Sequence, residues 1–433
     1  MTERCTRKSS VLLLGATGFI GSRTLAALLD AGYEVTCGVR DRGTFSRCRG
    51  VNVDFNQDRS ESAWLPRLNG IDIVINAVGI LRESETASFE ALHVAAPVAI
   101  FSACSRAGLR KVVQISALGA DQHAASRYHR SKKQADDRLA ALSIPWVIVQ
   151  PSLVFGQGGA SAALFNRLAA LPVVPVPGDG KQNIQPIHVD DLAAAIVRVL
   201  ETSEYDRQRI AAVGPRSLNL REFLAALRLT MGLGHARFLQ VPMALVRAAA
   251  TVGDKLRRGL LDRESLGMLT RGNVASATAI TALLGRAPRP VESFIEPASA
   301  RAVANEARLA WLLPVLRATV GLVWIVTGIV SLGIFPLAES YALLARVGLT
   351  GMLASIALYG AALLDFAFGI GVFVMPCRRW LWRAQLLLIV AYMVIITIHL
   401  PEFWLHPYGP VLKNLPLLAA IMMLHEFEDR WNT

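Results

Sequence analysis

The chain has 433 residues, of which 53% are hydrophobic and only 18% are charged. Its mean hydropathy of +0.40 is too high for a purely soluble enzyme, whereas 45 basic and 33 acidic residues are too many for a protein that lies wholly within a membrane. The same composition excludes disorder, collagen-like repeats and a disulfide scaffold. Residues 311–433 hold only seven Lys or Arg and six Asp or Glu, so almost all of the net charge of +12 belongs to the residues before them. We therefore expect a soluble part followed by a membrane part.

Up to residue 155, short apolar runs alternate with helical stretches. Each run is apolar on both faces, as strands in a buried parallel sheet are. The predicted strands are residues 11–14, 34–39, 51–55, 71–77, 111–115 and 146–149. A helix is predicted over residues 22–31, closed by Gly32. This alternation predicts an α/β Rossmann-type domain with a doubly wound parallel sheet over residues 1–155.

Residues 156–305 have a weaker pattern, in which Pro and Gly punctuate two or three predicted helices. We expect a small α/β lobe that completes the first domain. If that domain is an enzyme, this lobe contacts the substrate, although the pattern identifies no individual contact.

Beyond residue 311, long stretches without charge follow one another. Because about twenty apolar residues span a bilayer, we predict an all-α transmembrane four-helix bundle over residues 311–430. Its spans are expected at about residues 315–335, 347–374, 384–401 and 408–425. The fourth carries Lys413 and is the marginal one.

Basic residues near the ends of these spans predict their orientation. Seven arginines lie on the side of the N-terminal domain and the C-terminus, against Arg346 and Lys413 on the other side. The seven are Arg301, Arg308, Arg317, Arg378, Arg379, Arg383 and Arg430. We therefore expect a multi-pass protein of the cytoplasmic membrane, with the N-terminal domain and the C-terminus in the cytoplasm. The missing signal-peptide pattern and five scattered cysteines without a C-x-x-C pair agree with that location.

The strongest motif is VLLLGATGFIG at residues 11–21. Glycines at this spacing, between a buried strand and a helix, allow a tight turn that approaches a pyrophosphate, and the free N–H groups of the helix then bind the phosphates. An ordinary glycine-rich turn is the alternative, but the position between strand and helix favours nucleotide binding. The predicted contacts are Gly15, Thr17, Gly18, Phe19, Ile20 and Gly21.

Further cofactor contacts are expected at the tips of the next strands. Arg40 follows the second strand, where an acidic residue would bind the ribose 2′-hydroxyl and an arginine suits a 2′-phosphate. We therefore expect NADPH to be preferred over NADH, unless Arg40 is only a solvated surface residue. Asp58, after the third strand, either meets the adenine or shapes a turn.

Ser116, Tyr128 and Lys132 form the candidate catalytic group. Tyr128 and Lys132 are four residues apart and so share one face of a helix. A nearby ammonium favours the phenolate, so we expect Lys132 to lower the pKa of Tyr128 and to equip the phenol for proton transfer. Ser116 follows the strand predicted at residues 111–115 and is expected to hydrogen-bond a substrate carbonyl.

Together these motifs resemble those of atypical or extended short-chain dehydrogenases/reductases, in particular the branch that includes the nucleotide-binding accessory subunit of respiratory complex I. The matching stretches are GATGFIG (15–21), GVRD (38–41), INAVG (75–79), QISALGA (114–120), YHRSK (128–132), QPSLVFG (150–156) and IHVDDLA (187–193). The resemblance implies NADP binding, with Tyr128 as acid/base, Lys132 on the nicotinamide ribose and Ser116 on the carbonyl.

The same resemblance implies that Asn76, Ala77 and Gly79 lie along the cofactor. It brings Pro151 and Ser152 near the nicotinamide. Asp191, in the last matching stretch, is expected to cap a helix rather than to react.

Residues 311–430 resemble the DoxX-like family of small four-helix membrane proteins, some of which are linked to quinone-coupled oxidation of sulfur compounds. The matching stretches are SYALLARVGLTG (340–351), LYGAALLD (358–365) and LPEFWLHPYGPVLKNLPLLAA (400–420). Asp365 lies deep in the second predicted span, where a charge costs roughly 2.5–3.5 kcal/mol. It is either a site residue or a protonated carboxyl hydrogen-bonded between helices.

Three functions stay open on the sequence. The leading one is a membrane-anchored, NADP-dependent oxidoreductase that passes hydride from NADPH to a carbonyl or quinone-type acceptor, which the membrane part predicts to be small and lipid-soluble. The second is a non-catalytic NADPH-binding assembly or structural factor for a respiratory or other membrane complex. The third is a nucleotide-sugar epimerase. We expect no nucleic-acid partner, because zinc-finger and basic helix-turn-helix patterns are missing, and no metal site, because His and Cys do not cluster.

Overall fold

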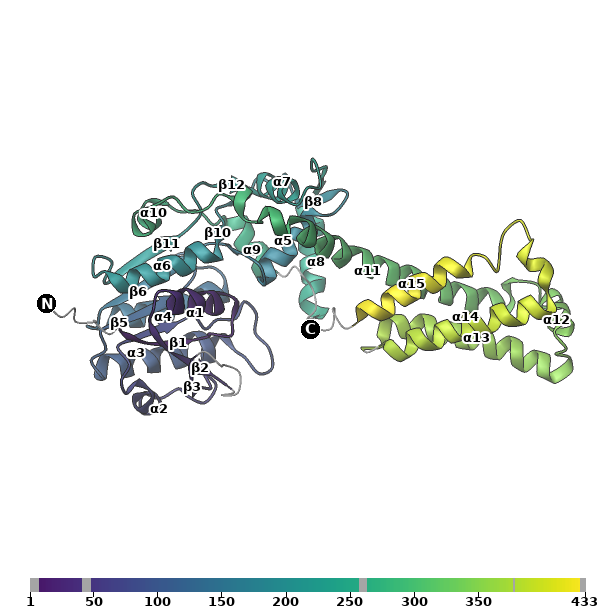
Figure 1. Ribbon diagram of the computed structural model, residues 1–433, viewed down its shortest axis with the longest axis horizontal. Helices are drawn as coiled ribbons and strands as arrows, with labels where there is room; N and C mark the ends of the chain where they lie inside the picture. Colours follow the sequence, from purple (N-terminus) through teal and green to yellow (C-terminus); the bar gives the residue numbers. More distant parts are fainter. Residues whose placement is uncertain (1–7, 41–47, 257–262, 377, 429–433) are drawn as a thin grey trace. The chain divides into compact units, whose positions relative to one another are not determined.

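The computed structural model describes residues 8–40, 48–256, 263–376 and 378–428 (Figure 1). The chain divides into two compact units, Met1–Ala307 and Arg308–Thr433. The division falls within one long helix, α11 (Pro297–Ile329). Each unit has a hydrophobic core of its own.

The first unit is built on a seven-stranded sheet in which all neighbouring strands are parallel. In spatial order the strands are β11 (Gln208–Ala212), β6 (Trp146–Pro151), β5 (Lys111–Ile115), β4 (Ile73–Asn76), β1 (Ser10–Leu14), β2 (Glu34–Val39) and β3 (Arg49–Asn52). The chain leaves β1 toward β2 on one side and later returns to β4 on the other. This reversal creates a crevice at the carboxyl ends of the central strands. The predicted doubly wound parallel sheet is confirmed.

Helices cover both faces of this sheet, because successive side chains of a strand point to opposite faces (Figure 1). Val11 and Leu13 face one core and Leu12 and Leu14 face the other. The first core is closed by α1 (Phe19–Asp30), α6 (Val189–Glu201) and α10 (Thr278–Leu284). The second is closed by α2 (Glu61–Trp64), α3 (Ala96–Arg106) and α4 (Arg127–Ala140).

Helix α1 begins three residues earlier than the sequence predicts. The backbone N–H of Ser22 donates to the Gly18 carbonyl, so the first turn closes directly after the glycine-rich turn. The end is as predicted: Gly32 has a φ of +81°, and its N–H and that of Tyr33 donate to Leu29 and Leu28. Such a left-handed glycine satisfies the last carbonyls of a helix.

Strand β11 was missed by the sequence analysis. It follows the excursion through the small lobe and returns to the edge of the sheet beside β6. Its first two residues, Gln208 and Arg209, are exposed. An edge strand does not need the two-sided apolar run by which the other strands were recognised.

The smaller lobe of the first unit has a separate core around Phe155, Phe223 and Phe294. Its helices are α5 (Ala160–Ala169), α7 (Leu220–Thr230), α8 (Met243–Leu256), α9 (Arg263–Arg271) and the 3₁₀ turn η4 (Val291–Ser293). Its strands pair as β7 (Val154–Phe155) with β10 (Ile187–His188), β8 (Val174–Pro177) with β13 (Phe238–Val241), and β9 (Asn183–Ile184) with β12 (Leu218–Asn219).

The second unit is helical. After α11 come η5 (Val330–Ile334), α12 (Leu337–Arg346), α13 (Gly351–Val374), α14 (Arg379–His399), η6 (Pro401–Trp404) and α15 (Asn414–Phe427). Among the described residues, three helical stretches are long and apolar enough to cross a membrane, namely Pro297–Ile334, Gly351–Val374 and Arg379–His399. Helix α15 is apolar but has only 14 residues, fewer than the roughly twenty that span a bilayer. The fourth predicted span is therefore shorter than the sequence suggested.

Candidate active site

The glycine-rich turn joins β1 to α1 at the crevice between β1 and β4. A Cβ atom added to Gly15, whose φ is +81°, would lie 2.9 Å from the Ala77 carbonyl. At Gly21 an added Cβ would lie 1.9 Å from the Gly15 oxygen. The turn therefore accepts only glycine at these two positions, and β1, β4 and α1 meet there as closely as backbones can.

This turn fits a nucleotide pyrophosphate. Helix α1 begins after Gly18 without a side-chain cap and has no acidic residue in its first turn. Thr17 and Gly18 are exposed at the tip of the turn. Free N–H groups and the positive end of the helix dipole together favour a phosphate.

Two other residues of the motif have different surroundings. The Phe19 ring lies against the small lobe, where a Cβ on Gly159 would come 2.8 Å from its Cζ. Ile20 packs partly against the core beneath the sheet. Their contact with a cofactor stays a prediction.

The polar side chains that follow β2 and β3 differ in whether they already have partners within the protein. Arg40 is exposed directly after β2. Asp58 is buried, and its carboxylate accepts the Asp54 N–H at 2.7 Å and pairs with Arg67 at 3.0 Å. The structure thus gives Asp58 the turn-forming role, and a contact with adenine stays a prediction.

Asn76 organises the end of β4. It is fully buried, its Nδ2 donates to Gln114 Oε1 at 2.8 Å, and its Oδ1 accepts the Val78 N–H at 3.2 Å. The Ala77 N–H donates to the Leu14 carbonyl, which ties this turn to β1. These bonds hold the backbone from Ala77 to Gly79 along the crevice.

Lys132, on α4, reaches the carboxyl ends of two strands. Its Nζ donates to the Val78 carbonyl at 3.2 Å and to the Ile115 carbonyl at 3.1 Å. A Cβ atom added to Gly79 would lie 3.1 Å from this Nζ. Because glycine has no side chain, the ammonium stays accessible from the crevice. Burial lowers the pKa of Lys132 to about 8. An ammonium has three donors, and two carbonyls leave one for a ligand.

Tyr128 lies one turn before Lys132 and is half-buried. Its ring contacts the rings of Phe89, His93 and His129 at centroid distances of 5.2–6.1 Å. Burial and then the charge of Asp136 raise the pKa of Tyr128 to about 12. The predicted lowering by Lys132 is therefore wrong for this structure, because burial and the negative charge of Asp136 both disfavour the phenolate.

Ser116 has a partner that the sequence analysis missed. Its hydroxyl donates to Asp136 Oδ2 at 2.5 Å, and Asp136 is fully buried. Burial raises the pKa of Asp136 to about 6. Asp136 follows Lys132 by four residues, so Tyr128, Lys132 and Asp136 share one face of α4. The spacing Y-x-x-x-K-x-x-x-D was the available signal.

His93 supports Tyr128 from a π-helical turn, η3 (Glu90–Ala95). Its Nε2 accepts the Ile80 N–H at 3.0 Å, so the proton of the neutral ring is on Nδ1. That Nδ1 donates to Ser131 Oγ at 2.9 Å, and Ser131 donates to the Tyr128 carbonyl at 2.8 Å. Burial, with the nearby charge of Lys132, lowers the pKa of His93 to about 2. The neutral ring thereby fixes the first turn of α4.

Pro151 and Ser152 lie at the end of β6. The Pro151 carbonyl accepts the Leu118 N–H, and the Ser152 hydroxyl donates to the Gln185 carbonyl at 2.5 Å. Both residues are buried. They join the sheet to the start of the small lobe, and their contact with a nicotinamide stays a prediction.

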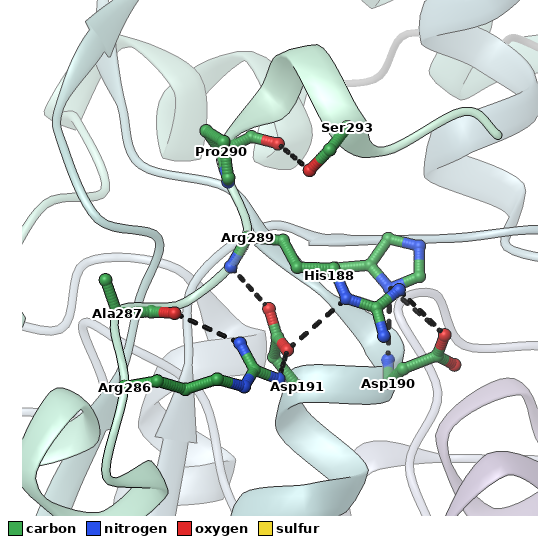
Figure 2. Close-up of polar contacts among 8 residues, drawn as sticks. All are labelled: His188, Asp190, Asp191, Arg286, Ala287, Arg289, Pro290 and Ser293. Atoms are coloured by element: carbon green, nitrogen blue, oxygen red, sulfur yellow. Dashed lines mark hydrogen bonds and ion pairs between the residues drawn. The ribbon is translucent and has the colours of Figure 1, made fainter. Parts of the chain in front are cut away.

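Asp191 anchors a distant segment rather than capping a helix, as Figure 2 shows. The cap of α6 is His188, whose Nδ1 accepts the Asp190 N–H. The buried Asp191 carboxylate accepts the Arg286 guanidinium at 2.5 Å and the Arg289 backbone N–H at 2.6 Å. The predicted capping role is wrong, because two donors from residues 286–289 already occupy the carboxylate.

Comparison with known proteins finds one family match in each of the two units. Residues 11–214 match the sequence model of the NAD dependent epimerase/dehydratase family, and residues 321–422 match that of the DoxX-like family. The chain joins an epimerase/dehydratase-type nucleotide-binding domain to a DoxX-like membrane domain. The resemblance stated from the sequence is confirmed, and the family implies binding of a nicotinamide cofactor.

Two relatives each match about half of this chain. A ceramide reductase of Caulobacter vibrioides is 29% identical over 195 residues, which are 44% of this chain and 61% of the relative. Subunit 9 of the NADH dehydrogenase [ubiquinone] 1 alpha subcomplex of Arabidopsis thaliana is 25% identical over 255 residues, 56% of this chain and 62% of the relative. The chain thus spans less than two thirds of the length of either.

A third relative and a solved structure complete the comparison. The photosystem II assembly factor Ycf39 of Synechocystis is 25% identical over 55% of this chain and 72% of its own length. A nucleoside-diphosphate-sugar epimerase from Staphylococcus aureus superposes with a TM-score of 0.53 at 16% identity, over 66% of this chain and 99% of that one. At that identity the likeness shows the fold alone.

Proposed function

We propose that this chain is a membrane-anchored, NADP-dependent oxidoreductase that reduces the carbonyl group of a small lipid-soluble acceptor, including a quinone-type carbonyl. One observation carries the proposal. Lys132 Nζ is held at the carboxyl ends of β4 and β5, with one donor left for a ligand, and Tyr128 lies one helical turn away. The glycine-rich turn that fits a pyrophosphate opens into the same crevice.

The cofactor we propose is NADPH rather than NADH. Arg40 supplies an exposed guanidinium at the tip of β2, where a 2′-phosphate requires a cation. Replacing Arg40 by Ala is expected to weaken NADPH binding on the order of tenfold while NADH binding changes little. Fluorescence titration with both cofactors tests this, and equal weakening for both would contradict the selection by Arg40.

NADPH bound in this crevice would supply hydride to the acceptor carbonyl. The Tyr128 phenol, which stays protonated because burial raises its pKa to about 12, then donates a proton to the reduced oxygen. The third donor of Lys132 would hold the ribose of the nicotinamide, which fixes the cofactor beside Tyr128. His93 and Ser131 hold the backbone of Tyr128 in place during the transfer.

The acceptor is assigned to the lipid phase. The DoxX-like domain would hold the enzyme at a bilayer, where a lipid-soluble acceptor is concentrated. A relative is named as a reductase of ceramide, a lipid. We further propose that the first unit and the C-terminus face the cytoplasm, where NADPH is supplied, because seven of the nine basic residues near the spans lie on that side.

The test uses the full chain, purified in mild detergent and supplied with NADPH. Oxidation is followed at the nicotinamide absorbance with a short-chain quinone and with a long-chain ketone as acceptors. Tyr128→Phe should reduce turnover on the order of 10²–10⁴-fold without loss of NADPH binding. Tyr33→Phe is the control, because Tyr33 directly precedes β2, at the opposite end of the strands.

A second function is favoured by particular observations. The relatives include an assembly factor and a complex I subunit, and the Tyr128 hydroxyl has no hydrogen bond within the described part of the chain. In that case the chain binds NADPH as a structural cofactor and supports assembly of a membrane complex. Tight NADPH binding with no oxidation by either acceptor, and no difference between wild type and Tyr128→Phe, would favour this second function.

A further inference from the structure

The hydrogen bond between Ser116 and Asp136 restricts the chemistry open to Ser116. A serine hydroxyl has one proton and two lone pairs. As long as Asp136 is ionised, Ser116 donates that proton to Asp136 Oδ2, at 2.5 Å. Ser116 then presents only lone pairs to the crevice and cannot donate to a carbonyl oxygen.

The surroundings of Asp136 make its charge costly. The residue is fully buried, and its Oδ1 has no hydrogen-bond partner among the described residues. Five groups face it: Ser116 directly after β5, Tyr128, Lys132 and Asp137 from α4 itself, and Arg209 from β11. Of these, Lys132 is bonded to two carbonyls, and Arg209 pairs with Asp137 at 2.6 Å. A buried carboxylate without its own cation takes up a proton more readily than an exposed one.

We propose that Asp136 is a positioning residue that sets the direction of the Ser116 hydrogen bond, so that a proton on Asp136 turns Ser116 into a donor toward the acceptor carbonyl. The protonated carboxyl then donates to Ser116 Oγ, and Ser116 donates its own proton outward. No proton is consumed at Asp136 or Ser116, because the proton that reaches the product comes from Tyr128. This inference rests on the proposed reduction of a carbonyl.

The direction of the pH dependence is set by burial, which raises the pKa of Asp136 to about 6. The donor form of Ser116 therefore predominates below that pH and is lost as the pH rises through it. The negative charge of Asp136 also raises the pKa of Tyr128. Neutralising Asp136 therefore favours both the carbonyl contact and the proton transfer.

The decisive variant is Asp136→Asn, whose uncharged amide does not titrate and offers Ser116 an N–H donor at every pH. Wild-type turnover should fall roughly tenfold per pH unit above about pH 6, whereas Asp136→Asn should show a flat profile. At about pH 8 the variant should be on the order of ten- to a hundredfold faster than wild type, and at about pH 5 the two should agree within about twofold. Asp190→Asn is the matched control, because Asp190 lies on α6, its side chain is 41% exposed, and it pairs with Arg289 and does not act on Asp136; it should keep the wild-type profile.

A second readout does not depend on turnover. Infrared spectra of the full chain should contain a carboxylic acid C=O band that appears on acidification with a midpoint near pH 6. The band should be missing in Asp136→Asn and shifted in Ser116→Ala. If the band behaves so but no acceptor oxidises NADPH at any pH, the proposed function has failed and the exchange between Ser116 and Asp136 stands. If the band does not titrate between about pH 5 and pH 8, or Asp136→Asn keeps the wild-type pH profile, the inference is overturned.

Discussion

Two buried carboxylates, one in each unit, differ in the partners that the chain gives them. Asp191, in the first unit, is fully buried and accepts hydrogen bonds from the Arg286 side chain and the Arg289 backbone (Figure 2). Asp365, in α13 of the second unit, is only 5% exposed, yet its Oδ1 has no hydrogen-bond partner among the described residues. Gln385 on α14 is also fully buried, with neither amide atom bonded in the described part of the chain. Depth of burial is similar for both acids, so the partner, and not the depth, distinguishes a structural carboxylate from one that costs stability.

The largest effect is expected from Asp191→Ala. The substitution leaves Arg286 and the Arg289 N–H without their acceptor and releases residues 286–289 from α6. Each hydrogen bond to a charged group contributes about 1.5–3 kcal/mol, so the loss of both should lower the free energy of unfolding by about 3–4 kcal/mol. Denaturant unfolding of the full chain in detergent measures it. Asp190→Ala, at a side chain that is 41% exposed and also pairs with Arg289, should cost less than about 1 kcal/mol; equal losses would mean that the pairing of Asp191 is not what stabilises this region.

Glu428→Gln places the same question in the second unit. Glu428 is 1% exposed, and it accepts Arg378 Nη1 at 2.8 Å and Trp382 Nε1 at 2.8 Å. The amide keeps one acceptor but loses the charge, so we expect a loss of roughly 1–3 kcal/mol in the same unfolding measurement. A Glu428→Gln protein as stable as wild type would show that the charge of Glu428 and its pairing with Arg378 do not stabilise the helical unit.

A buried titratable group can also be stable in its neutral form, as His93 is, with both ring nitrogens hydrogen-bonded. The folded protein keeps His93 neutral down to about pH 2, because burial and the charge of Lys132 oppose its protonation, whereas the unfolded chain takes up that proton near pH 6.5. Its contribution to stability is therefore present above about pH 6.5 and is lost as the pH falls, by about 2 kcal/mol at pH 5.

The measurement is the unfolding free energy of wild type and of His93→Gln at about pH 7 and pH 5. On acidification, the free energy of unfolding should fall more in wild type than in His93→Gln. Burial raises the pKa of Asp136, so acidification stabilises the folded state at that residue. This effect is the same in both proteins, and the difference between them therefore reports on His93. Equal pH dependence in the two proteins would contradict a neutral, buried His93.

Much of the fold could be predicted, because parallel strands that are buried on both faces appear in the sequence as short runs of apolar residues. All six predicted strands overlap strands of the sheet, although β3 covers residues 49–52 and not the predicted 51–55, and the glycine spacing predicted the turn at Gly15–Gly21. Strand β11 was missed because an edge strand has polar residues. The length of α15 was overestimated because Gly409 and Pro410 lie in turns that occupy the first part of the apolar stretch.

The candidate site was predictable only as far as spacing along one element reaches. Tyr128 and Lys132 were assigned to one helical face by their separation of four residues. That the Ser116 proton goes to Asp136 depends on how α4 packs on β5, and the support from His93 depends on a π-helical turn nearly forty residues earlier. Burial and the charge of Asp136, which together raise the pKa of Tyr128, also depend on the surroundings and cannot be read from a motif.

The smallest effect, and of opposite sign, is expected from Asp365→Leu. An unpaired polar group in an apolar interior is destabilising, so the substitution should leave stability unchanged or raise it by about 1 kcal/mol. Asp365→Asn, which keeps a polar group of the same shape, should stay close to wild type. A clear loss in Asp365→Leu would mean that the carboxyl has a partner in the bilayer and is structural, like Asp191. A stabilised Asp365→Leu protein that oxidises NADPH more slowly in lipid vesicles, but not with a water-soluble acceptor, would mean that the unpaired carboxyl serves function at the expense of stability.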